Sequence, residues 1–169
     1  SSRIQKKQIK STTFASTFIL KLNQKNMSDF LKRFGDDLKK NIPGFIAATV
    51  TEVKSGLAYI SLSVIKDYDP ELASSFYLEI VRAKMNSITA LGLKDQKLDT
   101  IVVTLTSQIH FIDLSDNGEY FIYLVLQDGS NLNLGITKML INKYKQELKS
   151  IQQEQKTTKQ KSSFSNFFK

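Results

Sequence analysis

The residue types that could carry out chemistry are few in this chain of 169 residues. His110 is the only histidine, and it lies between Ile109 and Phe111 in a stretch that alternates like a strand. A Ser-His-Asp triad would have to use it, but a histidine in this setting is usually a strand or core residue. The chain has no cysteine and no G-x-x-x-x-G-K-[ST] sequence, which excludes a thiol nucleophile, a thiolate metal site and a P-loop.

One group of acidic residues invites comparison with a metal site. Asp67, Asp69 and Glu71 have the spacing of the start of a calcium loop, but such a loop needs glycine at its sixth position and glutamate at its twelfth. Leu72 and Leu78 occupy those positions. The better interpretation is the start of a helix, with Asp69 as its N-cap.

A second acidic group surrounds a predicted hairpin turn, where acids are common. It comprises Asp113, Asp116 and Glu119. No set of residues brings a nucleophile, a base and oxyanion donors together. The sequence therefore predicts a protein that is not an enzyme, with no catalytic residue, no metal site and no cofactor.

The formal net charge of +8 is concentrated at the two ends of the chain. Residues 1–10 contain four basic and no acidic residues, residues 154–169 carry +3, and the rest carries only +1. A nucleic-acid-binding fold usually carries its positive charge on the folded surface, so nucleic acid is not expected as a partner. No apolar run reaches the roughly 18 residues that span a bilayer. Membrane contact is therefore expected to be peripheral at most, and the location cytoplasmic.

Both ends are predicted to lie outside one central domain of residues 27–153. Within the basic N-terminal extension of residues 1–26, residues 11–26 fit either a helical stripe or a strand face, and their Ser and Thr content favours an extra edge strand. The basic C-terminal tail of residues 154–169 is predicted to be a solvated, disordered end, with docking on a partner as the alternative. The docking residues would be Phe164, Phe167 and Phe168.

Residues 42–65 organise the central domain. Pro43 and Gly44 end the preceding helical pattern, and two runs of alternating apolar residues follow, joined by Lys54-Ser55-Gly56. This pattern predicts an antiparallel hairpin. One face of its first strand is predicted to contain Ile46, Ala48 and Val50.

A long helix is predicted from Pro70 to about Leu91, ending at Gly92. Its apolar residues form two adjacent stripes, which together are wider than the roughly 100° that packing on one sheet requires. The stripe predicted to face the core contains Leu72, Ala73, Phe76, Ile80, Ala83, Ser87 and Leu91. The stripe predicted to form a dimer or partner interface contains Tyr77, Leu78, Val81, Met85 and Ile88.

Five further elements complete the domain. Strands are predicted at residues 98–106, 108–114 and 120–126, and the Asn-Gly pair between the last two is a strong hairpin signal. A first helix is predicted from an N-cap at Ser28, and a last helix has one apolar face up to Ile151. The predicted order is helix, two strands, long helix, three strands and helix, which makes an α+β domain.

Three stretches carry a resemblance to a known family: IPGFIAATV followed by SGLAYISLS, the long helix closing at LGL, and TIVVTLTSQIHFIDL followed by EYFIYLVL. Over roughly residues 28–151, the chain resembles the roadblock / dynein light-chain family, and in particular its bacterial small-GTPase-regulator relatives. The resemblance implies a roadblock-like α/β sandwich of order α-β-β-α-β-β-β-α. Its five-stranded antiparallel sheet would carry the long helix on one face and two helices on the other.

The resemblance also implies a function. Family members form dimers that pair the long helices and join the sheets edge to edge, and they serve as platforms that bind small Ras-like GTPases. A homodimer, or a heterodimer with a paralogue, and a small Ras-like GTPase are therefore the expected partners. The alternative is a roadblock-like adaptor or structural subunit of a non-GTPase assembly, in which the C-terminal tail docks to a partner.

Overall fold

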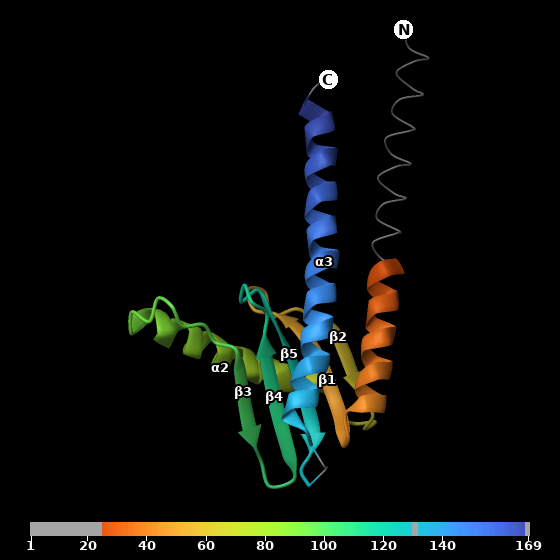
Figure 1. The fold of residues 1–169 in the computed structure, drawn as a ribbon, viewed down its shortest axis with the longest axis vertical. Coiled ribbons are helices and arrows are strands. Elements are labelled where there is room, and N and C mark those ends of the chain that lie inside the picture. Colours follow the sequence, from red (N-terminus) through yellow and green to blue (C-terminus); the bar gives the residue numbers. More distant parts are fainter. Residues whose placement is uncertain (1–24, 130–131, 168–169) are drawn as a thin grey trace. The chain divides into compact units, whose positions relative to one another are not determined.

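The computed structural model describes residues 25–129 and 132–167 (Figure 1). The predicted edge strand in the N-terminal extension and the predicted docking residue Phe168 lie outside the described residues. The chain divides into two compact units, one of residues 35–141 and one that combines residues up to 34 with residues 142 onward. Each unit is described by itself.

The described elements follow the predicted order. A first helix of residues 25–41 precedes β1 (Phe45–Glu52), β2 (Ala58–Ser63), α2 (Pro70–Ala90), β3 (Thr100–Thr104), β4 (Gln108–Leu114), β5 (Tyr120–Gln127) and α3 (Leu134–Phe167). The strands form one five-stranded sheet in the order β2-β1-β5-β4-β3, and each neighbouring pair is antiparallel. The predicted fold class, an α/β sandwich of order α-β-β-α-β-β-β-α, is confirmed.

The middle strand β5 is buried on both faces of the sheet. Side chains alternate between the two faces of a strand, and Phe121, Tyr123 and Val125 join the core that α2 covers. Tyr120, Ile122, Leu124 and Leu126, which alternate with them, are buried as well. The strand therefore has a continuous apolar character rather than the alternation of a half-exposed strand.

The larger unit covers the two faces of its sheet with different helices. In Figure 1, α2 crosses one face of the sheet, and Thr51 of β1 donates a hydrogen bond to Ser74 of α2 there (3.2 Å). On the opposite face, a Cβ placed on Gly35 of the first helix would lie 3.0 Å from Leu62 Cδ1 of β2. Glycine at this position thus allows the helix backbone to approach the strand closely.

The first strand differs in one detail from its predicted pattern. Ile46 was predicted to share a face with Ala48, but it packs together with Ala47 in the core beneath α2. The pairing of β1 with β5 shifts register between Phe45 and Ala47. Such an irregularity breaks the strict alternation of a strand, so the prediction for Ile46 was wrong.

The smaller unit contains an aromatic cluster. Tyr144 of α3 meets the rings of Phe30 and Phe34 edge-on, with centroids 5.6 and 5.0 Å away. Its hydroxyl donates to the backbone carbonyl of Arg33 (3.1 Å), and the Arg33 side chain forms an ion pair with Glu147. Aromatic pairs of this geometry are worth about 0.5–1.5 kcal/mol beyond the apolar area that they bury.

Two helix ends differ from their predictions. The first helix is already helical at residue 25, so Ser28 is not its N-cap. The backbone of α3 remains helical through Phe167, beyond the predicted domain end at residue 153. The segment after that residue is rich in Gln and Lys, which are good helix formers. Among the described residues, no helix has the length and apolar character needed to cross a membrane.

The N-terminus of α2 is capped as predicted. The Asp69 carboxylate accepts hydrogen bonds from the backbone N–H groups of Glu71 and Leu72, both at 3.0 Å. Gly92, with φ of +66°, follows the C-cap residue Leu91. The acidic group that resembles a calcium loop is thus the start of a helix.

Replacing Asp69 with alanine should lower the free energy of unfolding by about 1 kcal/mol, because two backbone donors lose their acceptor. Asp69→Asn keeps an acceptor oxygen and should retain most of the stability. Urea denaturation of the two variants checks this. Equal losses in both variants would show that the carboxylate charge, and not the cap, stabilises the helix.

Candidate interaction surface of the long helix

The inner side of α2 packs on the sheet. Leu78 and Val81 are buried in the core, and Ala73, Tyr77 and Met85 pack against the same cluster. The sequence-based prediction for the two apolar stripes of this helix was the reverse of what the structure shows. The stripe that was predicted to be an interface faces the sheet, and most of the stripe that was predicted to face the core is exposed.

The physical reason lies in the polar partners. Ser74 of α2 is buried and lies in line with Leu78 and Val81. Its hydroxyl accepts a hydrogen bond from Thr51, which in turn contacts the Thr49 hydroxyl at 3.1 Å. Buried hydroxyls need partners, so these groups fix which side of the helix faces the sheet. The periodicity of the helix alone does not contain this information.

The exposed side of α2 presents a row of large apolar side chains. Leu72, Phe76 and Ile80 are 57%, 67% and 46% exposed. Residues four apart lie above one another on a helix, so the three form one line, which we call the outer stripe. A contiguous exposed apolar surface of this kind usually marks an interaction site.

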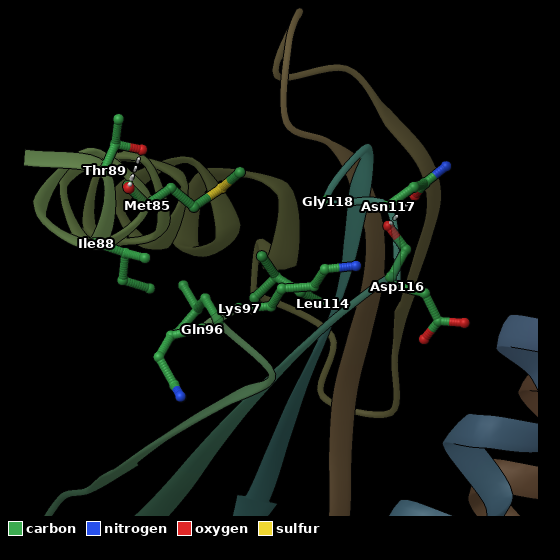
Figure 2. Close-up of a pocket in the computed structure, with 11 residues that line it drawn as sticks. Met85, Ile88, Thr89, Gln96, Lys97, Leu114, Asp116, Asn117 and Gly118 are labelled. Atoms are coloured by element: carbon green, nitrogen blue, oxygen red, sulfur yellow. Dashed lines mark hydrogen bonds between the residues drawn. The ribbon is translucent and has the colours of Figure 1, made fainter. Parts of the chain in front are cut away.

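Next to the C-terminal half of α2 lies a pocket of about 260 Å³ (Figure 2). Its walls come from α2, from the connection to β3 and from the β4–β5 turn. They include four apolar residues, Met85, Ile88, Leu98 and Leu114, and two charged ones, Lys97 and Asp116. Two of the residues that were predicted to form an interface, Met85 and Ile88, therefore line a recess of the surface.

The pocket does not bring catalytic groups together. Its polar side chains include Thr89, Ser115 and Asn117. Ser115 donates to Asn117 Oδ1 (2.8 Å) and accepts from the backbone N–H of Tyr120 (3.1 Å), which is the role of a turn residue. In the part of the chain that the structure describes, no group of three His, Cys, Asp or Glu residues could hold a metal ion.

A polar cluster lies beneath the middle of α2. His110 of β4 is buried, and its Nδ1 atom lies 2.7 Å from the Tyr77 hydroxyl and 2.9 Å from the Tyr123 hydroxyl. The Tyr123 hydroxyl contacts that of Tyr68 at 3.1 Å. His110 Nε2 lies 3.1 Å from Gln108 Oε1. His110 is therefore a core residue with satisfied nitrogens, and nothing in this arrangement is a triad.

Burial sets the proton affinities in this cluster. It lowers the pKa of His110 below its ordinary value, since a charged imidazolium loses its hydration there. Burial likewise raises the pKa of Tyr77 and of Tyr123. Burial thus favours the neutral form of all three groups. The sequence did not predict it, because its members are far apart in the chain and meet only when α2 lies on the sheet.

The predicted tail site is only partly covered by the structure. Phe164 and Phe167 lie on the helical backbone of α3, one turn apart, and Phe168 lies outside the described residues. Docking of this tail therefore stays a prediction.

Several solved structures have a fold similar to that of this chain. MglB of Myxococcus xanthus matches with a TM-score of 0.61 and 12% identity, over 77% of this chain and 90% of that one. An MglB structure with a tetrameric arrangement matches with a TM-score of 0.59 and 15% identity, over 78% of this chain and 91% of that one. A Roadblock/LC7 domain from Streptomyces avermitilis matches with a TM-score of 0.53 and 13% identity, over 72% of this chain and 93% of that one.

The chain has the Roadblock/LC7 fold. At sequence level, no protein-family model and no curated protein matches it. Identities of 12–15% show that the fold is retained with largely different side chains. The outer stripe of α2 must therefore be interpreted from this chain's own residues.

The two sides of α2 should differ in how much a substitution by glutamate lowers the stability of the fold. Val81→Glu places a charge in the core without a partner and should cost about 4 kcal/mol or more, enough to unfold a domain of this size. Phe76→Glu, on the outer stripe, should leave the chain folded. Circular dichroism and thermal unfolding distinguish the two. A folded Val81→Glu variant would contradict the orientation of α2.

Proposed function

We propose that this chain is a non-enzymatic dimeric platform that binds a small Ras-like GTPase and regulates or scaffolds it. The observation that carries the proposal is the outer stripe of α2, where Leu72, Phe76 and Ile80 are exposed in one line. The proposed interface is thus on the long helix, as the sequence predicted, but on its other side.

A dimer would bury the outer stripe against its own copy. Two helices packed along this line remove six large apolar side chains from water. Each is worth roughly 1.5–3 kcal/mol when fully buried, before the cost of association is subtracted. A homodimer, or a heterodimer with a paralogue, covers the same surface. The MglB structure with a tetrameric arrangement supports self-association, because it shows a protein of this fold in an oligomer.

The sheet offers a second contact for the dimer. Strands β2 and β3 are at the two edges of the sheet, and an edge strand presents unpaired backbone donors and acceptors. Val102 of β3 and Leu105 beyond it are exposed. Edge-to-edge pairing of two sheets, which the roadblock resemblance implies, would add backbone hydrogen bonds to the contact made by the outer stripe.

Binding of a small GTPase is tested by a capture experiment in the presence of either GDP or a GTP analogue. The full chain is immobilised and incubated with lysate of the native cell, once with GDP and once with a non-hydrolysable GTP analogue. Mass spectrometry should identify a small GTPase that is enriched in one of the two states. A partner that is indifferent to the nucleotide would contradict the GTPase platform.

The interface is tested with charge on the outer stripe. Phe76→Glu or Ile80→Glu should convert a dimer into a folded monomer, because burying an unpaired carboxylate at the contact is costly, and should abolish partner capture. Asn86→Glu is the matched control, since Asn86 is exposed on the same helix and outside the outer stripe. Sedimentation velocity reports the mass. A Phe76→Glu chain that remains a dimer would exclude this interface.

The alternative is a roadblock-like adaptor of a non-GTPase assembly, in which the C-terminal tail docks to the partner. The helical backbone of α3 favours it, because the helix continues through Phe167 and so includes two of the three predicted docking residues. Deletion of residues 156–169 should then abolish partner capture while sedimentation still shows the dimer. Capture that is unchanged by this deletion would remove the tail from the proposal.

A further inference from the structure

We propose that residues 11–22 add to the sheet as a further strand, hydrogen-bonded to the open edge of β2. The proposal joins an edge strand that the structure describes to a segment that lies outside the described residues. It stands apart from the proposed function, because it concerns how the chain covers its own sheet.

The outer side of β2 offers backbone groups for pairing. β2 is at one end of the sheet order, and its partner among the described strands is β1. The N–H of Val64 donates to the carbonyl of Ile46 (2.8 Å), so the even-numbered residues from 60 to 64 direct their backbone groups to β1, and the odd-numbered ones direct theirs outward. Ser61, in the middle of the strand, therefore presents an N–H and a C=O to an incoming strand.

The same edge lacks the protection that exposed edge strands normally have. Natural edges are blunted by charged residues, by proline or by a covering element, but residues 57–65 (LAYISLSVI) contain no charge and no proline. Four large apolar residues in this stretch are between 42% and 59% exposed, namely Leu57, Tyr59, Val64 and Ile65. An open apolar edge of this kind is a site of association unless something covers it.

The segment before the first helix has a composition that suits this edge. Residues 11–22 (STTFASTFILKL) are rich in Phe and Thr, which favour strands, and Lys21 is the only charged residue among them. With the alternation of a strand, Phe14, Phe18 and Leu22 share one face. A nearly uncharged strand of this kind can cover an uncharged apolar edge without burying unpaired charges.

The first helix makes β2 the nearer of the two edges. A Cβ placed on Gly35 would lie 3.0 Å from Leu62 Cδ1 of β2, so the helix backbone lies close to the edge strand. Ten helical residues separate Gly35 from residue 25, a length of about 15 Å, and residues 23–24 remain as a short connection. The opposite edge, β3, is four strand positions away from β2, about 19 Å across the sheet.

Covering β2 leaves β3 as the sheet edge that a second copy can use. A sheet with two open edges can pair repeatedly with further copies, whereas covering one edge ends the assembly at a pair. This consequence rests on the proposed dimer, and the docking of residues 11–22 does not.

Amide-resolved hydrogen exchange at low protein concentration tests the docking. In the full chain, the Ser61 amide should exchange at least about tenfold more slowly than its intrinsic rate, and deletion of residues 1–22 should remove this protection. The Leu62 amide faces β1 and should stay protected in both chains, which shows that the sheet is intact. Protection of Ser61 that survives the deletion would mean that another copy occupies the edge, and intrinsic exchange in the full chain would mean that nothing does. Either result would overturn the proposal.

Two proline variants of the full chain distinguish an added strand from a helix. Neighbouring residues of a strand direct their N–H groups to opposite sides, and proline is tolerated on an edge strand where its nitrogen faces solvent. One of Ser16→Pro and Thr17→Pro should therefore expose the Ser61 amide, while the other leaves it protected. Equal loss in both variants, as expected for a helix, or loss in neither would exclude the added strand.

Sedimentation of the full and shortened chains separates this proposal from the proposed function. If the deletion turns a dimer into oligomers that grow with concentration, both the dimer and the covering of β2 are supported. If the full chain is monomeric but protection of Ser61 still requires residues 1–22, the dimer fails and the added strand stands. A dimer that the deletion leaves unchanged, although Ser61 loses its protection, would overturn the limit on assembly.

Discussion

The packing of α2 on the sheet is the contact on which the rest of this structure depends. Strand β5 is buried on both faces, so the sheet is stable only when each face is covered by apolar surface. In the larger unit, α2 supplies that cover with Leu78 and Val81. The helix has 21 residues and more apolar surface than one sheet face can use. What remains uncovered is the outer stripe.

Polar contacts determine how the helix lies. The core side of α2 could be almost any apolar stripe of suitable width, since apolar packing is weakly directional. Thr51 with Ser74, His110 with Tyr77 and the Val53 carbonyl with Arg82 are directional and allow one rotation of the helix. Buried polar groups that are all satisfied fix a unique arrangement. In this chain the same contacts decide which apolar residues become available to a partner.

The described surface presents apolar side chains and open sheet edges rather than an assembled set of catalytic groups. The one histidine is enclosed by tyrosines, and the pocket beside α2 is lined by apolar residues and turn residues. The same surface contains a line of exposed apolar side chains on α2 and two sheet edges, β2 and β3. A Roadblock/LC7 fold with these features offers helix and sheet-edge contacts to another chain. Its specificity would then come from residues that differ among proteins of this fold, as identities of 12–15% allow.

The sequence by itself determined the elements of the larger unit and their order. The Lys54-Ser55-Gly56 turn, the Asp69 cap and the Asn-Gly turn before β5 are local signals, because a few neighbouring residues set the backbone geometry. The strands between them were predicted within about two residues for the same reason. The absence of a P-loop sequence and of cysteine was equally visible. These are properties of short stretches, and the tertiary structure did not change them.

Only the tertiary structure decided which side of α2 is buried. Two adjacent apolar stripes on one helix satisfy the 3.6-residue period equally well, and the choice between them depends on Thr51, His110 and Tyr123, which come from three strands. The register shift that turns Ile46 toward α2 has the same origin in strand pairing. Contacts between residues far apart in the chain carry no signal in the local pattern, and they exist only once the sheet has formed.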